Sequence, residues 1–228
     1  MQFPEPVSRR GRPAKAPLSR RSILDAALAL IRERSVDAVT LRDVAAAVNT
    51  GPASLYAYFA SRDALLEHAL DEVYGTVELV EVAAGGWEAA LSATIVNTIH
   101  ALESHPGIGV VALGTVPTLP GALRLAEHEL ALMEAGGISD EDAALAIDLI
   151  AQFAVATAVE RTVRHREGRG TSGQENDVLA AYATADPERF PRVRRLAPAL
   201  TAADEHRRRD FAIQVIISGL TAKRHGRV

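Results

Sequence analysis

The sequence predicts an all-α protein in which three short N-terminal helices, arranged as a helix-turn-helix unit, precede a larger helical domain. Apolar residues recur at intervals of three and four through much of the 228-residue chain, as they do on one face of a helix. No stretch shows the strict alternation of a half-buried strand. Asn, Gly and Pro separate the periodic segments, as is typical of turns between helices.

Apolar spacing and a capping motif define the first two helices. The first begins near Ser22, and its apolar stripe comprises Ile23, Ala26, Ala27, Leu30 and Ile31. Thr40 and Asp43 have the spacing of a capping box, in which each side chain bonds the backbone of the other. The second helix is therefore expected to begin at Thr40 and to last about two turns.

A tight turn and a third helix follow. Asn49 and Gly51 tolerate a left-handed backbone, and Pro52 suits the first position of a helix that we expect over residues 52–59. Ser61 can cap a longer connecting helix, expected over about residues 61–82. The helix-turn-helix unit is thus assigned to residues 20–66.

The second domain, residues 83–228, is expected to hold five helices. We place them over residues 87–104, 121–135, 139 to about 167, 187–196 and 204–222. Proline and glycine predict bends at residues 105–107 and 113–121. Residues 166–177, rich in Gly, Ser and Thr, are predicted to form a mobile loop.

Charge is divided unevenly along the chain. The net charge is −4, yet residues 1–60 carry nine Lys and Arg against five Asp and Glu, so this part is positive and the remainder strongly negative. Six basic residues and no acidic ones lie between Ser8 and Arg21. Residues 1–19 are therefore predicted to be a flexible basic arm that meets a polyanion, with a solubilising tail as the alternative.

Composition also limits where the protein acts and what it does. Cysteine is absent, which excludes disulfides and thiolate sites and suits a reducing cytoplasm. The first residues lack the apolar centre of a signal peptide, and Asp148, Gln152 and Thr157 interrupt the apolar run Ala143–Val159, which we interpret as a buried helix rather than a membrane span. No motif of a hydrolase elbow, phosphate loop or metalloprotease is present, so an enzyme is not expected.

The helix-turn-helix segment resembles the signature of the tetracycline-repressor (TetR) family. The likeness is specific in Ser54-Leu-Tyr-x-Tyr-Phe59 and in Ser61-Arg-Asp-x-Leu-Leu66. It implies a DNA reader joined to a helical ligand domain, in which Leu55 and Phe59 hold the recognition helix to the core. By the same resemblance, the residues expected to face the major groove are Pro52, Ala53, Ser54, Tyr56 and Tyr58, and those expected to contact phosphates are Thr40, Arg42 and Arg62.

Two features of this reader set it apart from the family pattern. Asn49 stands where glycine is usual in the turn, and Gly51 and Ala57 leave the recognition helix poor in long hydrogen-bonding side chains. Few direct base contacts are therefore expected. Tyr56 and Tyr58 have an alternative role, in which they pack within the protein or touch phosphates.

The likeness extends into the second domain, where it is similar to the tetracycline-repressor subgroup. It rests on Leu113-Gly-Thr-Val-Pro-Thr118, Glu127-His-Glu-Leu-Ala131, Ser139-x-Glu-x-Ala143 and Phe211–Leu220. The ligand-binding residues that it implies are Ala112, Thr115, Pro117, Ala126, Glu129, Ala144, Ile147 and, across a dimer, Glu160. Small side chains among them favour a bulky apolar or polycyclic ligand, although close helix packing would also explain the alanines.

A metal is not expected with that ligand. The subgroup binds a drug–Mg²⁺ chelate through a histidine that directly precedes the Leu-Gly-Thr motif, and Ala112 occupies this position here. Loss of the imidazole removes the basis for holding the chelate. His100, His105 and His128 do not have a metal-ligand spacing, so no cofactor is predicted.

These observations together predict a ligand-released repressor that binds a palindromic operator as a homodimer. Residues 143–159 and 211–220 are apolar on more faces than one chain covers, which favours twofold pairing. Two reading heads related by a twofold axis imply a palindrome. A cytoplasmic location, at the nucleoid when DNA is bound, follows. A dimeric regulator without an effector and an activator are the alternatives.

Overall fold

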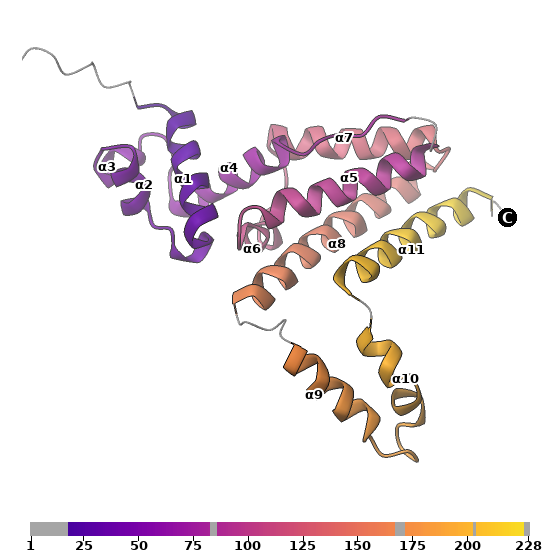
Figure 1. Cartoon of the computed structure of the whole chain (residues 1–228). Coiled ribbons are helices and arrows are strands. Elements are labelled where there is room, and N and C mark those ends of the chain that lie inside the picture. Colours follow the sequence, from indigo (N-terminus) through magenta and orange to yellow (C-terminus); the bar gives the residue numbers. More distant parts are fainter. Residues whose placement is uncertain (1–17, 83–85, 167–171, 203, 226–228) are drawn as a thin grey trace, which may run out of the picture.

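The computed structural model describes residues 18–82, 86–166, 172–202 and 204–225, which form helices joined by short connections (Figure 1). A small N-terminal head leads through one connecting helix into a larger helical body, and a helical hairpin projects from that body.

The head contains α1 (Arg20–Arg34), the 3₁₀ turn η1 (Val36–Ala38), α2 (Leu41–Ala47) and α3 (Pro52–Leu55), and α4 (Arg62–Gly75) connects it to the body. The body contains α5 (Gly86–Glu103), α6 (Ile108–Leu113), α7 (Pro120–Ala135), α8 (Asp140–Arg166) and α11 (Glu205–His225), and the hairpin contains α9 (Ser172–Ala183) and α10 (Pro191–Ala202). This arrangement confirms the predicted all-α fold.

Local hydrogen bonds begin and end the helices of the head as the sequence predicts. The Thr40 hydroxyl accepts from the backbone N–H of Asp43 at 3.2 Å, and the Asp43 carboxylate accepts from the Thr40 N–H at 2.9 Å, which forms the expected capping box. Asn49 adopts a left-handed φ of 54° in the turn after α2. These features fix the angle at which α3 follows α2.

The head and the body share one apolar core. Leu102 of α5, Ile108 of α6 and Val155 of α8 belong to the same buried cluster as the apolar residues of α1 to α4. The carbonyl oxygen of Pro106 also accepts hydrogen bonds from the Ser35 hydroxyl and the Val36 N–H, both at 2.9 Å. The head is therefore held by packing and polar contacts in addition to its covalent link through α4.

Two helices of the N-terminal region are shorter than predicted. The third ends at Leu55 instead of residue 59, and the connecting helix ends at Gly75 instead of about residue 82. From Gly75 onward, two side chains of α7 contact backbone carbonyl oxygens that a longer helix would have used. The Arg124 guanidinium donates to the carbonyl oxygens of Gly75 and Val77. A ring nitrogen of His128 lies 3.2 Å from the carbonyl oxygen of Val80. Tertiary hydrogen bonds thus replace the last turns of the expected helix.

The second domain also departs from the prediction at three places. Residues 108–113 form α6 between the two expected bends, where no helix was predicted. Residues 172–183 form α9, which was not predicted either, and its first six residues lie in the segment expected to be a loop. Gly109 lets α6 approach α8 closely, because a Cβ there would lie 3.0 Å from Val159 Cγ2. The helix expected over 187–196 begins at Pro191 and ends at Ala202. The arm prediction for residues 1–17 and the loop prediction for residues 167–171 lie outside the described residues.

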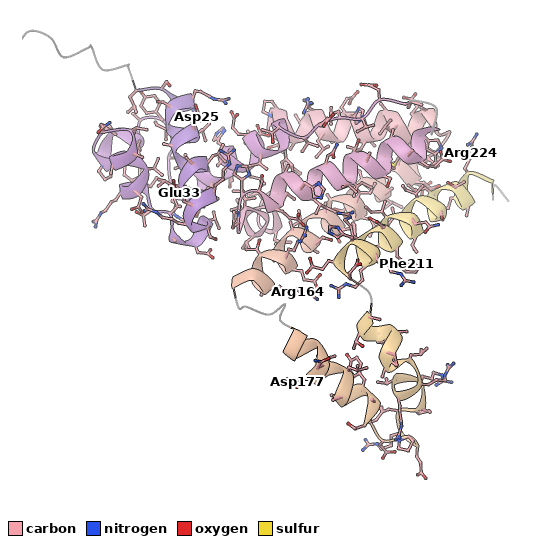
Figure 2. All side chains as sticks on the ribbon, viewed as in Figure 1. Asp25, Glu33, Arg164, Asp177, Phe211 and Arg224 are labelled. Atoms are coloured by element: carbon pink, nitrogen blue, oxygen red, sulfur yellow. The ribbon has the colours of Figure 1, made fainter. Side chains whose placement is uncertain are left out.

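Helix α8 is long and apolar enough to cross a membrane by length and composition alone, over Asp140–Arg164. One side of it packs on α5, α6 and α7, which is the arrangement of a core helix. Its other side exposes Leu145 and Leu149, and α11 likewise exposes Val215 and Phe211, whose side chain is 67% exposed (Figure 2). The expected excess of apolar surface on these two helices is therefore present in the single chain.

The end of α4 is pressed against the start of α7. A Cβ added to Gly121 would lie 2.1 Å from the carbonyl oxygen of Asp71 and 2.9 Å from the nitrogen of Gly75, so the two backbones meet where only glycine fits. The Asp71 carboxylate accepts from the N–H of Ala122 at 2.9 Å, which satisfies a free amide in the first turn of α7. We call this contact the α4–α7 joint.

Substitution Gly121→Ala should destabilise the protein by about 1–3 kcal/mol, because the new methyl group forces α4 and α7 apart. Gly75→Ala, at the same joint but with no atom within 4 Å of the added Cβ, should be neutral or stabilise by up to about 1 kcal/mol. Urea denaturation of both variants measures the difference. Equal stabilities would show that the close approach at Gly121 is not a constraint.

Candidate functional site

The outer surface of α2 and α3 forms a shallow depression. Its lining residues are Thr40, Leu41, Arg42, Pro52, Tyr56 and Arg62. The Tyr56 side chain is 57% exposed, and Pro52, Ala53 and Ser54 beside it are also exposed. Leu55 and Phe59 are buried and hold this segment to the head. The surface therefore brings together most of the residues that the resemblance assigns to DNA.

Tyr58 and Arg62 also have contacts inside the protein. The half-buried Tyr58 donates its hydroxyl proton to the carbonyl oxygen of Leu18 at 2.8 Å. The Arg62 guanidinium donates to the carbonyl oxygens of Val39 at 3.0 Å and Val36 at 2.6 Å. Both side chains thus stabilise the head, and their contact with DNA stays a prediction.

A second candidate site is a partly open cavity of about 230 Å³ lined by α4, α5, α7 and α8, together with Pro117 of the loop before α7. Its wall is mostly apolar. The lining residues are Tyr74, Thr98, Pro117, Ala122, Leu125, Ala126, Glu129, Ile147, Asp148, Ile150, Ala151, Ala154 and Val155. Four residues that the resemblance assigns to a ligand are among them: Pro117, Ala126, Glu129 and Ile147. An apolar cavity with few polar groups is typical of small-molecule sites.

The other four assigned residues lie elsewhere in this chain. Thr115 lines a smaller adjoining hollow of about 140 Å³ that shares Pro117 with the cavity. Ala112 is half-buried against the shared core of head and body, and Ala144 is exposed on α8. Glu160 is exposed and pairs with Arg164 at 2.5 Å. The single chain thus places these residues outside the cavity wall.

Sequence reasoning missed Tyr74 and Thr98, which contribute polar atoms to the wall. Tyr74 follows Leu70 by four residues, so it lies on the buried stripe of α4 and helical spacing could have identified it. Thr98 donates its hydroxyl proton to the Thr94 carbonyl oxygen at 2.9 Å, within its own helix. No sequence signal separates it from an ordinary core threonine.

Glu129 is the most perturbed ionisable group of the cavity. Only 4% of the residue is exposed, and burial raises its carboxyl pKa to about 8. Burial, and to a lesser degree the charge of Glu129, raise the pKa of Tyr74 to about 12. Near neutral pH the cavity therefore holds a largely protonated carboxylic acid beside a neutral phenol.

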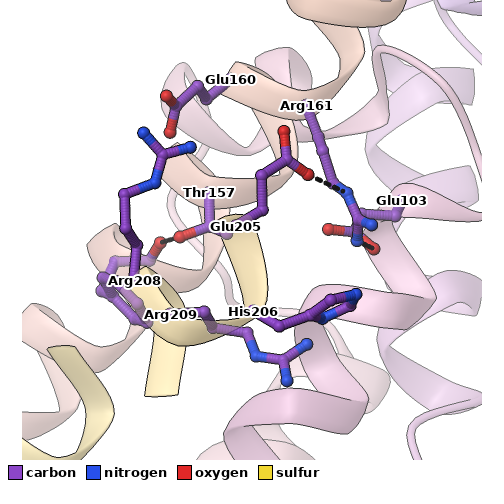
Figure 3. A pocket seen from close by; sticks show the side chains of 9 residues that line it. Glu103, Thr157, Glu160, Arg161, Glu205, His206, Arg208 and Arg209 are labelled. Atoms are coloured by element: carbon purple, nitrogen blue, oxygen red, sulfur yellow. Dashed lines mark hydrogen bonds and ion pairs between the residues drawn. The ribbon is translucent and has the colours of Figure 1, made fainter. Parts of the chain in front are cut away.

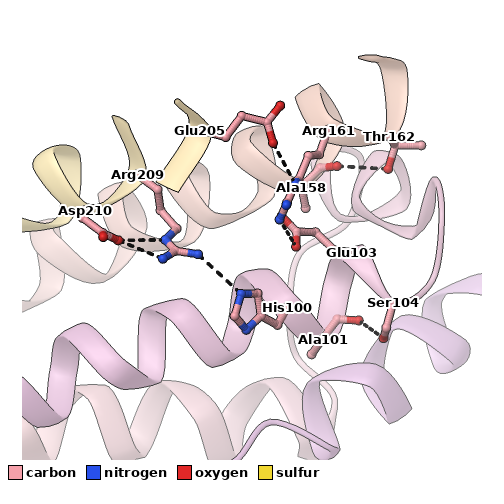
Figure 4. A network of polar contacts seen from close by, with 10 residues as sticks. All are labelled: His100, Ala101, Glu103, Ser104, Ala158, Arg161, Thr162, Glu205, Arg209 and Asp210. Carbon is pink, nitrogen blue, oxygen red and sulfur yellow. Dashed lines mark hydrogen bonds and ion pairs between the residues drawn. The ribbon is translucent and has the colours of Figure 1, made fainter. Parts of the chain in front are cut away.

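A polar pocket of about 150 Å³ lies between α5, α8 and α11 (Figure 3). Arg161 donates to Glu103 at 2.6 Å and to Glu205 at 3.0 Å, and Arg209 joins α11 to His100 of α5 at 3.4 Å (Figure 4). These contacts tie three helices together. In the described residues no group of three or more His, Asp or Glu side chains is arranged to hold a metal ion.

Comparison with known families agrees with this architecture. Residues 23–69 match the model described as bacterial regulatory proteins, tetR family, and residues 81–224 match the tetracyclin repressor-like C-terminal domain. The chain belongs to the TetR family. Its members are transcriptional regulators with an N-terminal helix-turn-helix domain, and the identification confirms the resemblance seen in the sequence.

Individual relatives are similar over different lengths. The repressor DrrR1 of Streptomyces coeruleorubidus is 29% identical over 70% of this chain, and the match covers 61% of DrrR1, less than two thirds of it. A transcriptional regulator of Saccharopolyspora erythraea is 26% identical over 96% of this chain and 89% of its own length. Apo ActR of Streptomyces coelicolor has a TM-score of 0.86 and 29% identity, covering 94% of this chain and all of ActR.

The raised pKa of Glu129 predicts a pH-dependent stability. Its carboxyl keeps a proton in the folded state that the unfolded chain loses above about pH 4.5, so its contribution to stability is complete below that pH and is lost as the pH rises through about 8. Between about pH 5 and pH 8 the free energy of unfolding should fall by a few kcal/mol more in the wild type than in Glu129→Gln. Urea titrations at both pH values measure this, with exposed Glu127→Gln as the control. An equal fall in the free energy of unfolding in all three proteins would contradict the prediction that Glu129 causes the pH dependence.

Proposed function

We propose that this TetR-family regulator is a cytoplasmic repressor that binds a palindromic operator as a homodimer and releases it when a small molecule, bulky and apolar or polycyclic, enters the cavity. One observation carries the proposal: α4 both enters the reading head and forms a wall of the cavity. Leu65 and Leu66 at its start lie in the core of the head, whereas Tyr74 near its end faces the cavity. Any ligand that displaces the end of α4 acts directly on the head.

The α2–α3 surface supports operator recognition. Arg42 offers donors for phosphates, and Thr40, whose hydroxyl donates to the Asp43 carboxylate at 2.5 Å in this structure, would have to turn its hydroxyl proton outward to join it. Short exposed side chains at Pro52, Ala53 and Ser54 allow α3 to approach base edges. Exposed Tyr56 adds a ring and a hydroxyl at the same place. In this proposal the head binds mainly through the backbone of the DNA, with few direct base contacts.

The α4–α7 joint supports coupling between ligand and operator. Ala122, Leu125, Ala126 and Glu129 of α7 line the cavity, and α7 is fixed to α4 through Gly121 and Asp71. A ligand that pushes α7 outward would carry the end of α4 with it and change the separation of the two heads. A coupling of about 1–3 kcal/mol between the two sites is enough for a switch.

The exposed apolar residues of α8 and α11 support the dimer. Leu145, Leu149, Phe211 and Val215 are each more than half exposed in the single chain, and burying them against a twofold mate removes that surface from water. A dimer of this kind would place Ala144 and Glu160 of α8 near the partner chain. This agrees with the resemblance, which assigns Glu160 to the ligand site across the dimer.

The relatives support a ligand of polycyclic type. ActR, 29% identical, has been solved in complex with actinorhodin, with a TM-score of 0.83 to this chain. The TetR variant of Acinetobacter baumannii that holds minocycline is 20% identical and shows the shared fold alone. The mostly apolar wall of the cavity fits a ring system, and Ala112 takes the place of the metal-binding histidine, so we propose binding without a metal.

A gel shift with DNA from upstream of the protein's own coding sequence tests the proposal. The purified protein should retard this DNA, and a polycyclic compound that raises its melting temperature should relieve the shift. Relief would establish operator and effector together. A compound that binds without weakening the complex would contradict ligand-released repression, and absence of any shift would argue against this operator.

Arg42→Ala should weaken binding to all DNA sequences by a similar factor, because a phosphate contact carries no sequence information. The slope of log affinity against log salt concentration should also become less steep by about one, because one counterion fewer is released on binding. Arg42 is exposed at the α2–α3 surface, where its guanidinium can reach a phosphate. Arg32→Ala removes an equal charge from a hollow on another side of the head and serves as the control. Fluorescence anisotropy at several salt concentrations compares them. Identical slopes for both variants would place the DNA elsewhere.

A further inference from the structure

We propose that the cavity between α4, α5, α7 and α8 selects ligands in which an apolar ring system carries a basic nitrogen, with Glu129 as the counter-ion of that nitrogen. The inference rests on the proposed function only in taking this cavity as the effector site. Ligand binding can be measured without DNA, so the two ideas can fail separately.

The first argument is that Glu129 has no partner of its own. It lies on α7, is 96% buried, and lines the cavity. Its carboxyl makes no hydrogen bond with the described residues, and burial is the sole cause of its raised pKa. A buried polar group without a partner costs stability, so its presence at a ligand-sized cavity indicates a contact supplied by the ligand.

The second argument is the sign of the surrounding charges. The ionisable side chains that line the cavity are Glu129, Asp148 and Tyr74, and no Lys, Arg or His is among its lining residues in the described chain. Nearby basic groups are engaged elsewhere: Arg124 bonds the carbonyls at the end of α4, and His128 contacts the Val80 oxygen. The lining groups can therefore become negative but not positive, and the cavity offers no counter-ion for an anion.

The other charged groups near the cavity add no positive charge to it. Asp148 on α8 is exposed and accepts from Gln152 at 2.6 Å, so it adds negative charge at the rim. The Asp71 carboxylate on α4 accepts a hydrogen bond from the N–H of Ala122. Thr98, the cavity-lining residue of α5, has no ionisable group. Apolar side chains form the rest of the wall and suit a flat hydrocarbon framework.

Binding of such a cation is coupled to a proton. Glu129 holds a proton in the empty cavity below about pH 8. When an ammonium ion enters, the carboxyl releases this proton to solvent, and the resulting carboxylate pairs with the ammonium, so that charge balances. The dissociation constant should therefore fall, by up to about tenfold per pH unit, as the pH rises toward 8.

The test compares two probes of nearly the same shape. Aminoacridine is a planar aromatic cation near neutral pH, and acridine is its uncharged parent. Isothermal titration of the full-length protein with each probe, from about pH 6.5 to about pH 8, gives affinity and proton release in the absence of DNA. The variants are Glu129→Gln, which keeps the shape but not the charge, and Glu127→Gln, which removes an exposed charge two residues away on α7.

We expect Glu129→Gln to weaken aminoacridine binding by about tenfold or more and to abolish its pH dependence, because the ion pair is lost. Acridine affinity should change little in either variant, and Glu127→Gln should behave as the wild type. Melting temperatures confirm that both variants are folded.

Three results would overturn the inference: failure of aminoacridine to bind, tighter binding of acridine than of aminoacridine to the wild type, or equal loss of both probes in Glu129→Gln. If a neutral compound binds and releases the operator instead, the proposed function stands while this inference fails. If aminoacridine binds as expected but leaves operator affinity unchanged, the ligand class stands and ligand-released repression fails.

Discussion

The contact between Gly121 of α7 and the backbone of Asp71 on α4 is the constraint on which the rest of the structure depends. At this point two helices approach more closely than any side chain would allow, and the Asp71 carboxylate locks the first turn of α7 in place. Helix α4 is packed into the head at one end and into this joint at the other. The positions of the cavity and of the α2–α3 surface therefore both depend on the placement of α4.

The wall of the cavity includes a buried carboxyl that costs the fold stability. An apolar side chain at position 129 would pack the space between α7 and α8 without an unpaired carboxyl, and it would remove the energetic cost of burying that group. Glu129 instead keeps a proton in the empty cavity, with Tyr74 neutral beside it. The polar groups that stabilise the body are gathered elsewhere, in the ion pairs of Arg161 between α5, α8 and α11.

Much of the head could be predicted from sequence because its signals are local. The capping box of Thr40 and Asp43, the left-handed Asn49 and the buried Leu55 and Phe59 each depend on neighbours a few residues away. Beyond the head, spacing predicted where α5, α7 and α8 lie, but it missed α6 and α9. A short or weakly patterned helix forms because another helix covers it, and that partner cannot be read from the segment itself.

By itself the sequence determined the family, the all-α fold and the identity of most residues on the α2–α3 surface, since periodicity, caps and a specific motif encode them locally. The tertiary structure decided where α4 ends and which four of the assigned ligand residues line one cavity. It also decided that Tyr74 and Thr98 line the same cavity. It also decided that Arg62 and Tyr58 bond backbone carbonyls within the head. The reason is that burial, carbonyl partners and a shifted carboxyl pKa arise only when helices distant in sequence are brought together.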